Sequence, residues 1–519
     1  MTKVRIPLAQ QLTTLDGSST TGVPTSGSCV LNGVIEKNAS VNPSPQAQVR
    51  RRKPMTWTTN GVVFYNTSGV AMTAVSFFLS TQPVPSTYST GPDQYYCCWV
   101  DTSGNLWAGI YSAGTVGGST TTAINLGVYS FSGIPQKYTG GFCFYYQNNL
   151  YVYGIGPAAP LNYTVNVSVS PWTSTTGANA ADRPVAYEYF DNYIVWAGAL
   201  GATVAYGQTA LFNSNFQDWA LANSFAANYQ QTQDQGGFTA LAANGNYLLA
   251  ATNVAIYFYY DTGNPVGSVL GLYKEATLPF GTYQFAKSRY GVAFVAANPS
   301  ETEVYFVPYN SIQATKISTP DIEKLIPGQN ICFVTQYGRP FIFVWRTNSN
   351  AVYVYDITAQ IWCPYDFGTV LLGVPLIQTH VTQNTDGSTI NDIIMLNNKM
   401  RINDEQIAST SAVWVDTIDN ATNPYLTLSQ VFLMDGATSE YKFYASAQVI
   451  GKRMPASTPV TIQYSDDGGA TYSSSSRKVD MTNIRPITYQ LGRSMDRIWQ
   501  VSYNGSYDVQ LTALEVDVD

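Results

Sequence analysis

The feature that most constrains this chain is a series of short apolar and aromatic segments that are joined in pairs by polar turns. Residues 239–242, Thr-Ala-Leu-Ala, and residues 247–251, Tyr-Leu-Leu-Ala-Ala, flank the turn Ala243-Asn-Gly-Asn246. This pattern predicts two antiparallel strands and a tight hairpin turn. Similar pairs recur roughly every 50 residues, with polar turns at Asn148, Asp191, Asn244, Asn298, Asn348 and Asn397. The repeat predicts a core built from hairpins.

Two further hairpins are especially clear, at residues 141–153 and 341–356. The second ends in Val352-Tyr-Val-Tyr-Asp-Ile-Thr-Ala-Gln-Ile-Trp362. Here a strand ends in Tyr-Asp, and Thr and then Trp follow, the Trp six residues after the Asp. This arrangement is typical of a propeller blade. Regular hairpins at this spacing suit a β-propeller, in which radial repetition leaves few exposed strand edges. A β-sandwich with a similar number of strands is the alternative.

Composition supports an all-β fold with a sparsely charged surface. The 519 residues include 38 Tyr and 41 Gly, whereas charged residues make up 11% and the formal net charge is −7. Tyrosine favours strands and glycine favours turns. No apolar run approaches the roughly 20 residues of a membrane helix, so no membrane insertion is expected. No apolar segment follows the charged start, so no secretory signal is expected either.

The sequence divides into three parts. Residues 1–55 are rich in Thr, Ser, Gly and Pro, and they predict an extended N-terminal arm lying on other surfaces. Within the arm, Cys29-Val-Leu-Asn-Gly-Val-Ile-Glu36 predicts a short strand pair across Asn-Gly. Residues 56–430 hold the repeated hairpins and predict the β-propeller, with inserted loops at about 83–92 and 158–179. Residues 431–519 contain closely spaced strands and predict a C-terminal β-sandwich-like segment or a closing blade.

The order of four segments in the middle of the chain is distinctive. The hairpin at 239–251 is followed by Ile256-Tyr-Phe-Tyr-Tyr-Asp-Thr-Gly263, by an aromatic strand with Gly at 290–295, and by Lys316-Ile-Ser-Thr-Pro-Asp-Ile-Glu323. In the last segment, hydroxyl residues, a Pro and early acidic residues predict a short helix over 318–325. This order resembles the packaged-DNA stabilisation, or tail nozzle (hub), proteins of short-tailed bacteriophages. Further similarity covers 31–54 weakly, 341–362, and 432 to the end.

The resemblance implies a structural protein of the virion tail, assembled in the host cytoplasm. In that family several copies, commonly six, form a ring at the portal vertex that retains packaged DNA and conducts it during ejection. The implied partners are further copies in a homo-oligomer with a six-fold ring, the head-to-tail adaptor ring above, tail fibre, spike or needle proteins, and double-stranded DNA in passage. Because a basic lumen would bind phosphates and stall transit, acidic residues are expected to outnumber basic ones on the lumen.

One dense basic run is present, formed by Arg50, Arg51, Arg52 and Lys53. No other stretch concentrates charge in this way, so the run is predicted to contact the adaptor or a neighbouring subunit through acidic partners. A solvated loop is the alternative.

Residues 465–472 match an Asp-box with Tyr in the last place. Its members are Ser465, Asp467, Gly469, Thr471 and Tyr472. The aspartate can accept backbone N–H bonds across a turn, the glycine supplies a positive φ, and the aromatic ring packs beneath, which predicts a structural turn. The adjacent Asp466 points away from its neighbour, so the two carboxylates are not an acid–base pair on one substrate.

Two other classes of function are weighed against the tail hub. A receptor-binding or glycan-binding tail protein would share the β-rich, Tyr-rich composition. A sialidase-like glycosidase would carry Asp-boxes and an Arg-Ile-Pro motif similar to Val4-Arg-Ile-Pro7, but it also needs three arginines, a Tyr–Glu pair and repeated boxes. With one histidine, His380, and six scattered cysteines, no catalytic residue, metal site or cofactor is expected, and the chain is predicted not to be an enzyme.

Overall fold

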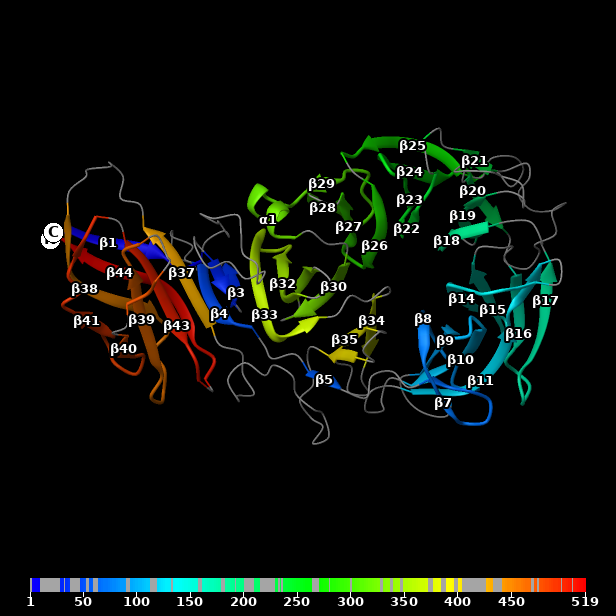
Figure 1. Ribbon diagram of the computed structural model, residues 1–519, viewed down its shortest axis with the longest axis horizontal. Coiled ribbons are helices and arrows are strands. Elements are labelled where there is room, and N and C mark those ends of the chain that lie inside the picture. The colour runs from blue at the N-terminus through cyan, green and yellow to red at the C-terminus, as the bar shows by residue number, and fades with distance from the viewer. Residues whose placement is uncertain are drawn as a thin grey trace.

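The computed structural model of the protein is almost entirely β (Figure 1). It describes residues 2–9, 29–31, 33–37, 47–52, 56–58, 64–89, 94–112, 119–131, 134–156, 161–178, 183–191, 193–199, 210–214, 229–231, 234, 237–263, 270–279, 281–298, 301–326, 330–336, 339–345, 349–371, 377–383, 389–395, 400–403, 426–432, 441–467, 471–473, 476–495, 497–505 and 507–519. Within these residues one short helix accompanies the strands. The all-β prediction is therefore confirmed.

Seven antiparallel sheets of four strands make up the middle of the described chain. In the first six, the strands pair in chain order, so that each sheet is a run of hairpins. The first three sheets contain β8 (Ala74–Pro83), β9 (Gln94–Asp101), β10 (Leu106–Ser112) and β11 (Ser119–Gly127); β14 (Gly140–Tyr146), β15 (Asn149–Ile155), β16 (Leu161–Asn166) and β17 (Thr173–Ala178); and β18 (Arg183–Phe190), β19 (Tyr193–Ala199), β20 (Ala210–Ser214) and β21 (Tyr229–Gln231). The next three contain β22 (Ala240–Asn244), β23 (Tyr247–Ala251), β24 (Ala255–Asp261) and β25 (Leu270–Thr277); β26 (Thr282–Ser288), β27 (Gly291–Ala297), β28 (Thr302–Pro308) and β29 (Thr315–Lys316); and β30 (Asn330–Gln336), β31 (Arg339–Trp345), β32 (Ser349–Asp356) and β33 (Ile361–Leu371).

The seventh sheet combines strands from two distant parts of the chain. It contains β34 (Ile377–Gln383), β35 (Thr389–Met395), β36 (Met400–Asn403) and, paired with β36, β5 (Thr56–Thr58). Since β5 precedes the first sheet in sequence, this pairing links the beginning of the series to its end. β34 also contacts β8 of the first sheet, and Figure 1 shows the sheets following one another in an arc that brings these two strands together.

Consecutive sheets pack against each other through apolar side chains. Between the fourth and fifth sheets, for example, Leu249, Phe258 and Phe294 are fully buried in one core cluster. A strand that is buried on both faces has a nearly continuous run of apolar residues. β9 is an example, because it is buried along its whole length. Burying one large apolar side chain stabilises the fold by about 1.5–3 kcal/mol. The layers between sheets are therefore a main source of the stability of this region.

Two hairpin turns are held by an aspartate that is followed by a tryptophan. Asp101 accepts hydrogen bonds from two backbone N–H groups of its turn, at 2.8 and 3.0 Å, and from the indole N–H of Trp107 at 2.9 Å. Asp356 likewise accepts from two backbone N–H groups at 2.8 and 3.0 Å, and Trp362 follows in the next strand. In both turns the carboxylate takes the place of backbone acceptors that the turn lacks.

The short helix predicted over 318–325 is present as α1 (Pro320–Leu325). Thr319 is its N-cap and accepts a hydrogen bond from the backbone N–H of Ile322. The proline stands in the first turn, where its missing N–H costs nothing. Ile322 and Leu325 are buried in the core cluster shared by the fifth and sixth sheets, so the helix packs on these two sheets.

Two larger sheets form a second part of the molecule, at the left of Figure 1. The seven-stranded sheet contains β1 (Thr2–Pro7), β3 (Gly33–Lys37), β4 (Ala47–Arg51), β38 (Lys442–Gly451), β41 (Ile487–Tyr489), β42 (Arg493–Ser494) and β44 (Gln510–Val518). The five-stranded sheet contains β2 (Cys29–Leu31), β37 (Leu426–Phe432), β39 (Pro459–Ser465), β40 (Arg477–Asp480) and β43 (Arg497–Tyr503). Buried side chains from both sheets, among them Val449, Trp499 and Leu514, belong to one core cluster. We call this region the two-sheet part.

Strands from the beginning of the chain lie in both of these sheets, which differs from the separate arm expected for residues 1–55. β1 pairs with β44 from Thr2↔Val518 to Pro7↔Ala513, β4 also pairs with β44, and β2 pairs with β37. The sequence predicts the two short strands at 29–36 but pairs them with each other, whereas in the structure β2 pairs with β37 and β3 with β4. β1 and β4 are short and stand among polar residues, so no local periodicity reveals them. Residues 1–55 and 431–519 therefore contribute to the same sheets.

A second difference concerns the inserted loop expected at about 158–179. Residues 161–178 contain β16 and β17, which pair in register from Leu161↔Ala178 to Asn166↔Thr173. Tyr163 and Val165 are buried while Thr164 between them is not. Buried and less buried residues therefore alternate as expected for a strand, and the many Ser and Thr residues obscured this pattern in the sequence. For the loop expected at 83–92, the structure describes residues up to 89, which follow β8 as a turn. Two small hairpins complete the described strands: β6 (Phe64–Tyr65) with β7 (Ala71–Met72), and β12 (Tyr129–Phe131) with β13 (Ile134–Gln136).

Replacing Ile6 tests the contribution of β1 to the two-sheet part. Ile6 pairs with Leu514 and is 3% exposed, so Ile6→Ala should leave a cavity and lower the free energy of unfolding by about 2–5 kcal/mol. Lys3→Ala is the matched control in the same strand, because the Lys3 side chain is 66% exposed and a solvent-exposed ion pair contributes little to stability. Urea unfolding measures both changes. Equal effects of the two substitutions would contradict a buried β1.

Candidate functional site

The Asp-box residues form a turn that follows β39. Asp467 accepts hydrogen bonds from the Ser465 hydroxyl at 2.5 Å and from the Thr471 backbone N–H at 2.9 Å, and the Thr471 hydroxyl donates to its other oxygen. These hydrogen bonds lower the pKa of Asp467 to about 2, and the bond from Ser465 has the largest effect. Tyr472 is partly buried, and Gly469 lies outside the described residues. The contacts of Asp467 stay within the turn.

A buried arginine lies beside this turn. Arg497 in β43 is 2% exposed, and its guanidinium donates to both carboxylate oxygens of Asp466 at 2.7 and 2.8 Å. Its central carbon lies 3.8, 4.5 and 5.5 Å from the ring centres of Tyr464, Tyr444 and Trp499. A planar guanidinium can bind a carboxylate bidentately and stack on aromatic faces at the same time. This cluster joins both sheets of the two-sheet part, because Tyr444 belongs to β38 and Trp499 to β43.

The basic run at 50–53 begins with an arginine that bonds within its own chain. Arg50 forms an ion pair with Glu36 at 2.7 Å and another with Asp508. Glu36 lies in the neighbouring strand β3, and the aspartate precedes β44. Arg50 therefore connects three strands of the seven-stranded sheet.

The next two residues of the basic run are buried. Arg51 donates to a backbone carbonyl and lies 5.7 Å from the ring centre of Tyr503, and Arg52 lies 5.2 Å from the ring centre of Tyr365 in β33. Arg52 thus links the two-sheet part to the sixth sheet. Lys53 lies outside the described residues. The contact of this run with an adaptor or neighbouring subunit stays a prediction, and two of its four residues are buried in the isolated chain.

The first strands of neighbouring sheets lie close together. β8 contacts β14, β18 contacts β22, β22 contacts β26, and β26 contacts β30. Lys287 of β26 donates to Glu188 of β18 at 2.6 Å, although the fourth sheet comes between these two sheets in the chain. The intervening strand β22 reads Ala-Leu-Ala-Ala-Asn, and its small side chains leave room for the bridge. Among the described side chains of these six first strands, Glu188 and Lys287 are the charged ones, and they neutralise each other.

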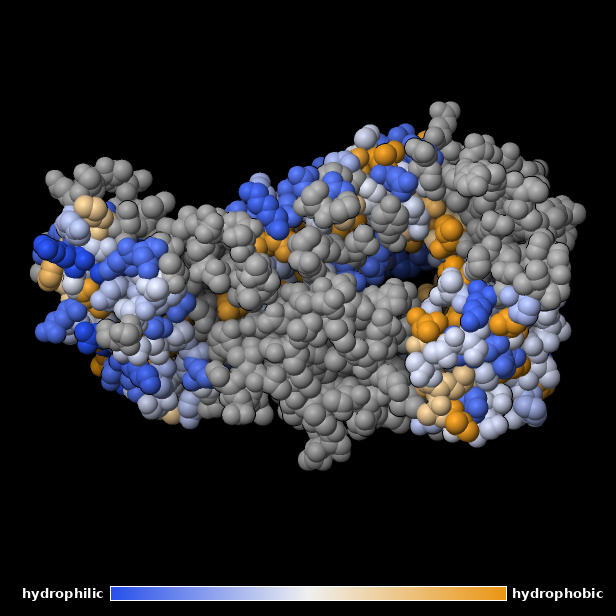
Figure 2. Space-filling view, in the orientation of Figure 1, coloured by the Kyte–Doolittle hydropathy of each residue, from blue (hydrophilic) through white to orange (hydrophobic). Residues whose placement is uncertain are grey.

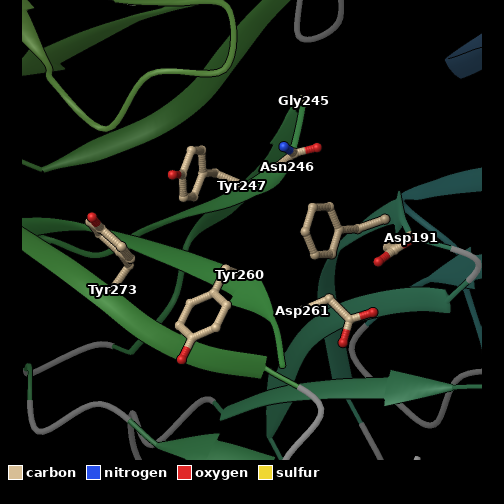
Figure 3. Close-up of a pocket in the computed structure, with 8 residues that line it drawn as sticks. Asp191, Gly245, Asn246, Tyr247, Tyr260, Asp261 and Tyr273 are labelled. Atoms are coloured by element: carbon tan, nitrogen blue, oxygen red, sulfur yellow. The ribbon is translucent and has the colours of Figure 1, made fainter. Parts of the chain in front are cut away.

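A cleft of about 680 Å³ lies between the third and fourth sheets. It is lined by the turn after β18, the turn between β22 and β23, and strands β23 to β25. Figure 3 shows Tyr247, Tyr260 and Tyr273 on one side of the cleft, and Asp191 and Asp261 on the other. The sequence pointed to Asp191 as a hairpin turn and to Tyr260 as part of an aromatic strand, but it gave no sign that they share a cleft.

Groups that often carry chemistry are sparse in the described part of the chain. Cys97, Cys98, Cys143 and Cys332 are buried and form no disulfide. Burial raises the pKa of the Cys97 and Cys332 thiols, which disfavours the reactive thiolate. No three His, Cys, Asp or Glu side chains of the described residues are placed to hold a metal ion. The His380 side chain lies outside those described, and α1 is too short to span a membrane.

No protein-family model and no curated protein matches this sequence. The contacts therefore have to be interpreted from their own chemistry. Sequence reasoning found the Asp-box turn because its residues are adjacent, and it missed Arg497 because the aromatic partners come from different strands. The one sequence signal for that cluster was an arginine at the start of the aromatic strand Arg497–Tyr503.

The Arg497 cluster should be a strong stabilising element. Arg497→Gln removes the ion pair and three ring contacts from a buried position, and we expect it to lower the free energy of unfolding by about 3–5 kcal/mol. Arg453→Gln is the matched control, since Arg453 is exposed and makes one hydrogen bond to a backbone carbonyl, and it should change stability by about 0.5 kcal/mol or less. Guanidinium unfolding of the two variants measures the difference. Similar losses would show that the cluster contributes little.

The Asp-box turn should lose its stabilising effect in acid. The folded-state pKa of Asp467 is lowered from 3.8 to about 2, so its ionised form stabilises the fold above pH 3.8 and this contribution disappears as the pH falls towards 2. The destabilisation caused by Asp467→Asn is therefore expected to be largest near neutral pH and to vanish in acid. Asn483→Ala, on an exposed turn, changes no titrating group and should give a constant difference. Unfolding measured across pH values checks this, and a pH-independent effect of Asp467→Asn would contradict it.

Proposed function

We propose that the seven four-stranded sheets are the blades of a β-propeller that β5 closes. In a propeller the blades repeat around an axis and few strand edges stay exposed. The pairing of β5 with β36 and the contact of β34 with β8 support closure, because both join the beginning of the series to its end. The bridge from Lys287 to Glu188 supports first strands that converge on one axis.

We further propose that the chain is a structural subunit of the tail hub, or nozzle, of a short-tailed bacteriophage. In this role copies of the chain close the portal vertex, retain the packaged DNA and conduct it during ejection. The observation that supports the proposal most is the position, in the structure, of the segments that resemble the tail hub family. They coincide with β22 to β24, β27, α1, β31 to β33 and the strands from β38 onward, so they include both the proposed blades and the two-sheet part.

The first strands of the four-stranded sheets limit where DNA could pass in such an assembly. The ion pair of Glu188 and Lys287 crosses the space where the strands β18 and β26 face each other. Side chains that meet at 2.6 Å leave no room for a duplex between those strands. DNA would therefore pass through the centre of a ring of several copies, and the lumen expected to be acidic or neutral is a surface between copies.

Exposed apolar side chains offer surfaces for such a ring. Val70, Leu272, Tyr309 and Ile484 are among the large apolar residues that lie exposed on the described surface. Figure 2 shows hydrophobic patches over the four-stranded sheets at the right, while the two-sheet part at the left is mostly hydrophilic on this face. Apolar surface rimmed by polar residues marks protein contacts more often than free surface. Because Ile484 lies in the two-sheet part and the other three lie among the proposed blades, both parts offer apolar surface for assembly.

The copy number of the chain in virions tests the proposed function. Quantitative mass spectrometry of purified particles should give about half as many copies of this chain as of a twelve-fold portal protein, because a six-fold ring lies at one vertex. Cryo-electron microscopy of the same particles should show the ring with seven blades in each subunit and more acidic than basic residues on the lumen. The major capsid protein, counted in the same sample, is the internal control.

Other results would contradict the tail hub. A ratio well above one half would point to peripheral fibres or spikes, and absence of the chain from particles would leave the proposal without support. A ring with a basic lumen would overturn the proposed path of DNA, because phosphates would bind there.

A further inference from the structure

The tyrosine side of the cleft between the third and fourth sheets is a continuous aromatic wall. Tyr247 and Tyr260 stand directly opposite each other on β23 and β24, and Tyr273 follows on β25. The ring centres of Tyr247 and Tyr273 lie 5.7 Å apart, and those of Tyr260 and Tyr273 lie 6.2 Å apart. Adjacent strands are about 4.8 Å apart, so a wall across three strands is longer than one sugar ring.

The wall is open to solvent where an ordinary packing cluster would be closed. Tyr260 is 39% exposed and Tyr273 is 56% exposed. Gly271 faces Tyr260 across the strand pair, and a Cβ at this glycine would lie 2.6 Å from the ring of Tyr260. The missing side chain lets that ring lie flat along β25. The rings keep one another in place and still present apolar surface to the cleft (Figure 3).

The opposite side of the cleft carries hydrogen-bond acceptors at short range from each other. The pKa of Asp191 is raised, first by side-chain hydrogen bonding with Asp261, then by burial and by the negative charge of Asp261. Both carboxyl groups stand on fixed backbone. Asp191 occupies a turn at φ 45°, and Asp261 also accepts the backbone N–H of Gly263 at 2.8 Å.

An exposed amide completes the lining of the cleft. The backbone N–H of Asn246 donates to Asn310 of the neighbouring fifth sheet's turn at 3.0 Å, and a Cβ at Gly245 would lie 2.9 Å from the same asparagine. The turn is therefore held from behind by its backbone. The Asn246 side chain lines the cleft and offers one acceptor and two donors.

We infer that this cleft binds a neutral, hydroxyl-rich oligosaccharide. The C–H face of a pyranose can lie on aromatic rings, since the π face is negative and the sugar C–H groups are weakly positive. Hydroxyl groups on the other face can donate to the two aspartates, and the amide of Asn246 can donate to or accept from a further hydroxyl. The cleft volume of about 680 Å³ is in the usual range for small-molecule sites.

The geometry favours this class of ligand over two others. An anionic sugar or a phosphate would be repelled by the paired carboxylates. An organic cation is best held by rings that surround it, whereas these three rings come from neighbouring strands of one sheet and lie on one side of the cleft. The inference goes beyond the proposed tail role and does not rest on ring formation.

Binding of named trisaccharides to the full-length chain tests the inference. Maltotriose, cellotriose, mannotriose and N,N′,N″-triacetylchitotriose are the neutral probes, and 3′-sialyllactose and a pentalysine peptide are the charged ones. Isothermal titration and saturation-transfer NMR should detect at least one neutral trisaccharide and neither charged probe. Tyr273→Ala should weaken that binding about tenfold or more, because it removes one ring contact, and Tyr273→Phe should retain it.

Matched variants separate a binding role from a structural one. Asp261→Asn should weaken binding while circular dichroism and the unfolding midpoint stay unchanged. Tyr489→Ala is the control, because Tyr489 is 60% exposed in the two-sheet part and should leave binding unaltered. The inference is overturned if no neutral trisaccharide binds, if Tyr273→Ala and Asp261→Asn both leave the affinity unchanged, or if a charged probe binds more tightly than the neutral ones.

Discussion

Pairing between strands from opposite ends of the chain is the constraint on which the rest of the structure depends. β44 pairs with β38 on one edge and with β1 and β4 on the other, and β5 pairs with β36 in the same way at the end of the seven sheets. The pairings of β1 and β4 with β44, and of β5 with β36, each close a loop of several hundred residues. The entropic cost of closure grows only with the logarithm of loop length, so such pairings are compatible with a stable fold. They are slow to form, and they hold the two parts of the molecule together once formed.

Several of the few charged side chains of this protein are buried and join separate strands. Arg497 binds Asp466 between aromatic rings, Arg52 lies against Tyr365 of the sixth sheet, and Lys287 reaches Glu188 across a strand of small residues. An arginine can be buried when its charge is paired and its planar face is stacked, as it is in the first of these clusters. The basic run that was predicted to contact a partner therefore also connects the two-sheet part to the sixth of the four-stranded sheets.

Features that depend on neighbouring residues could be predicted, and features that depend on distant ones could not. The hairpin at β22 and β23, the helix α1 and the Asp-box turn were foreseen, because a turn or cap is specified by side chains a few positions apart. The strands β1 and β4 were not foreseen, and β2 and β3 were predicted to pair with each other, because the partners of β1 and β2 lie near the other end of the chain. The strands β16 and β17 were mistaken for a loop because Ser and Thr are common in both loops and strands.

The sequence by itself determined the all-β class, the spacing of the hairpins and the position of their turns, because apolar alternation and turn residues act locally. Only the tertiary structure decided which strands share a sheet, that Arg497 is buried, and that Asp191 and Asp261 meet beside three tyrosines. These contacts join residues from separate sheets, and no local pattern encodes the packing of one sheet on another. Their physical origin is the burial of apolar faces, which fixes the sheets first and then brings the polar side chains at their edges together.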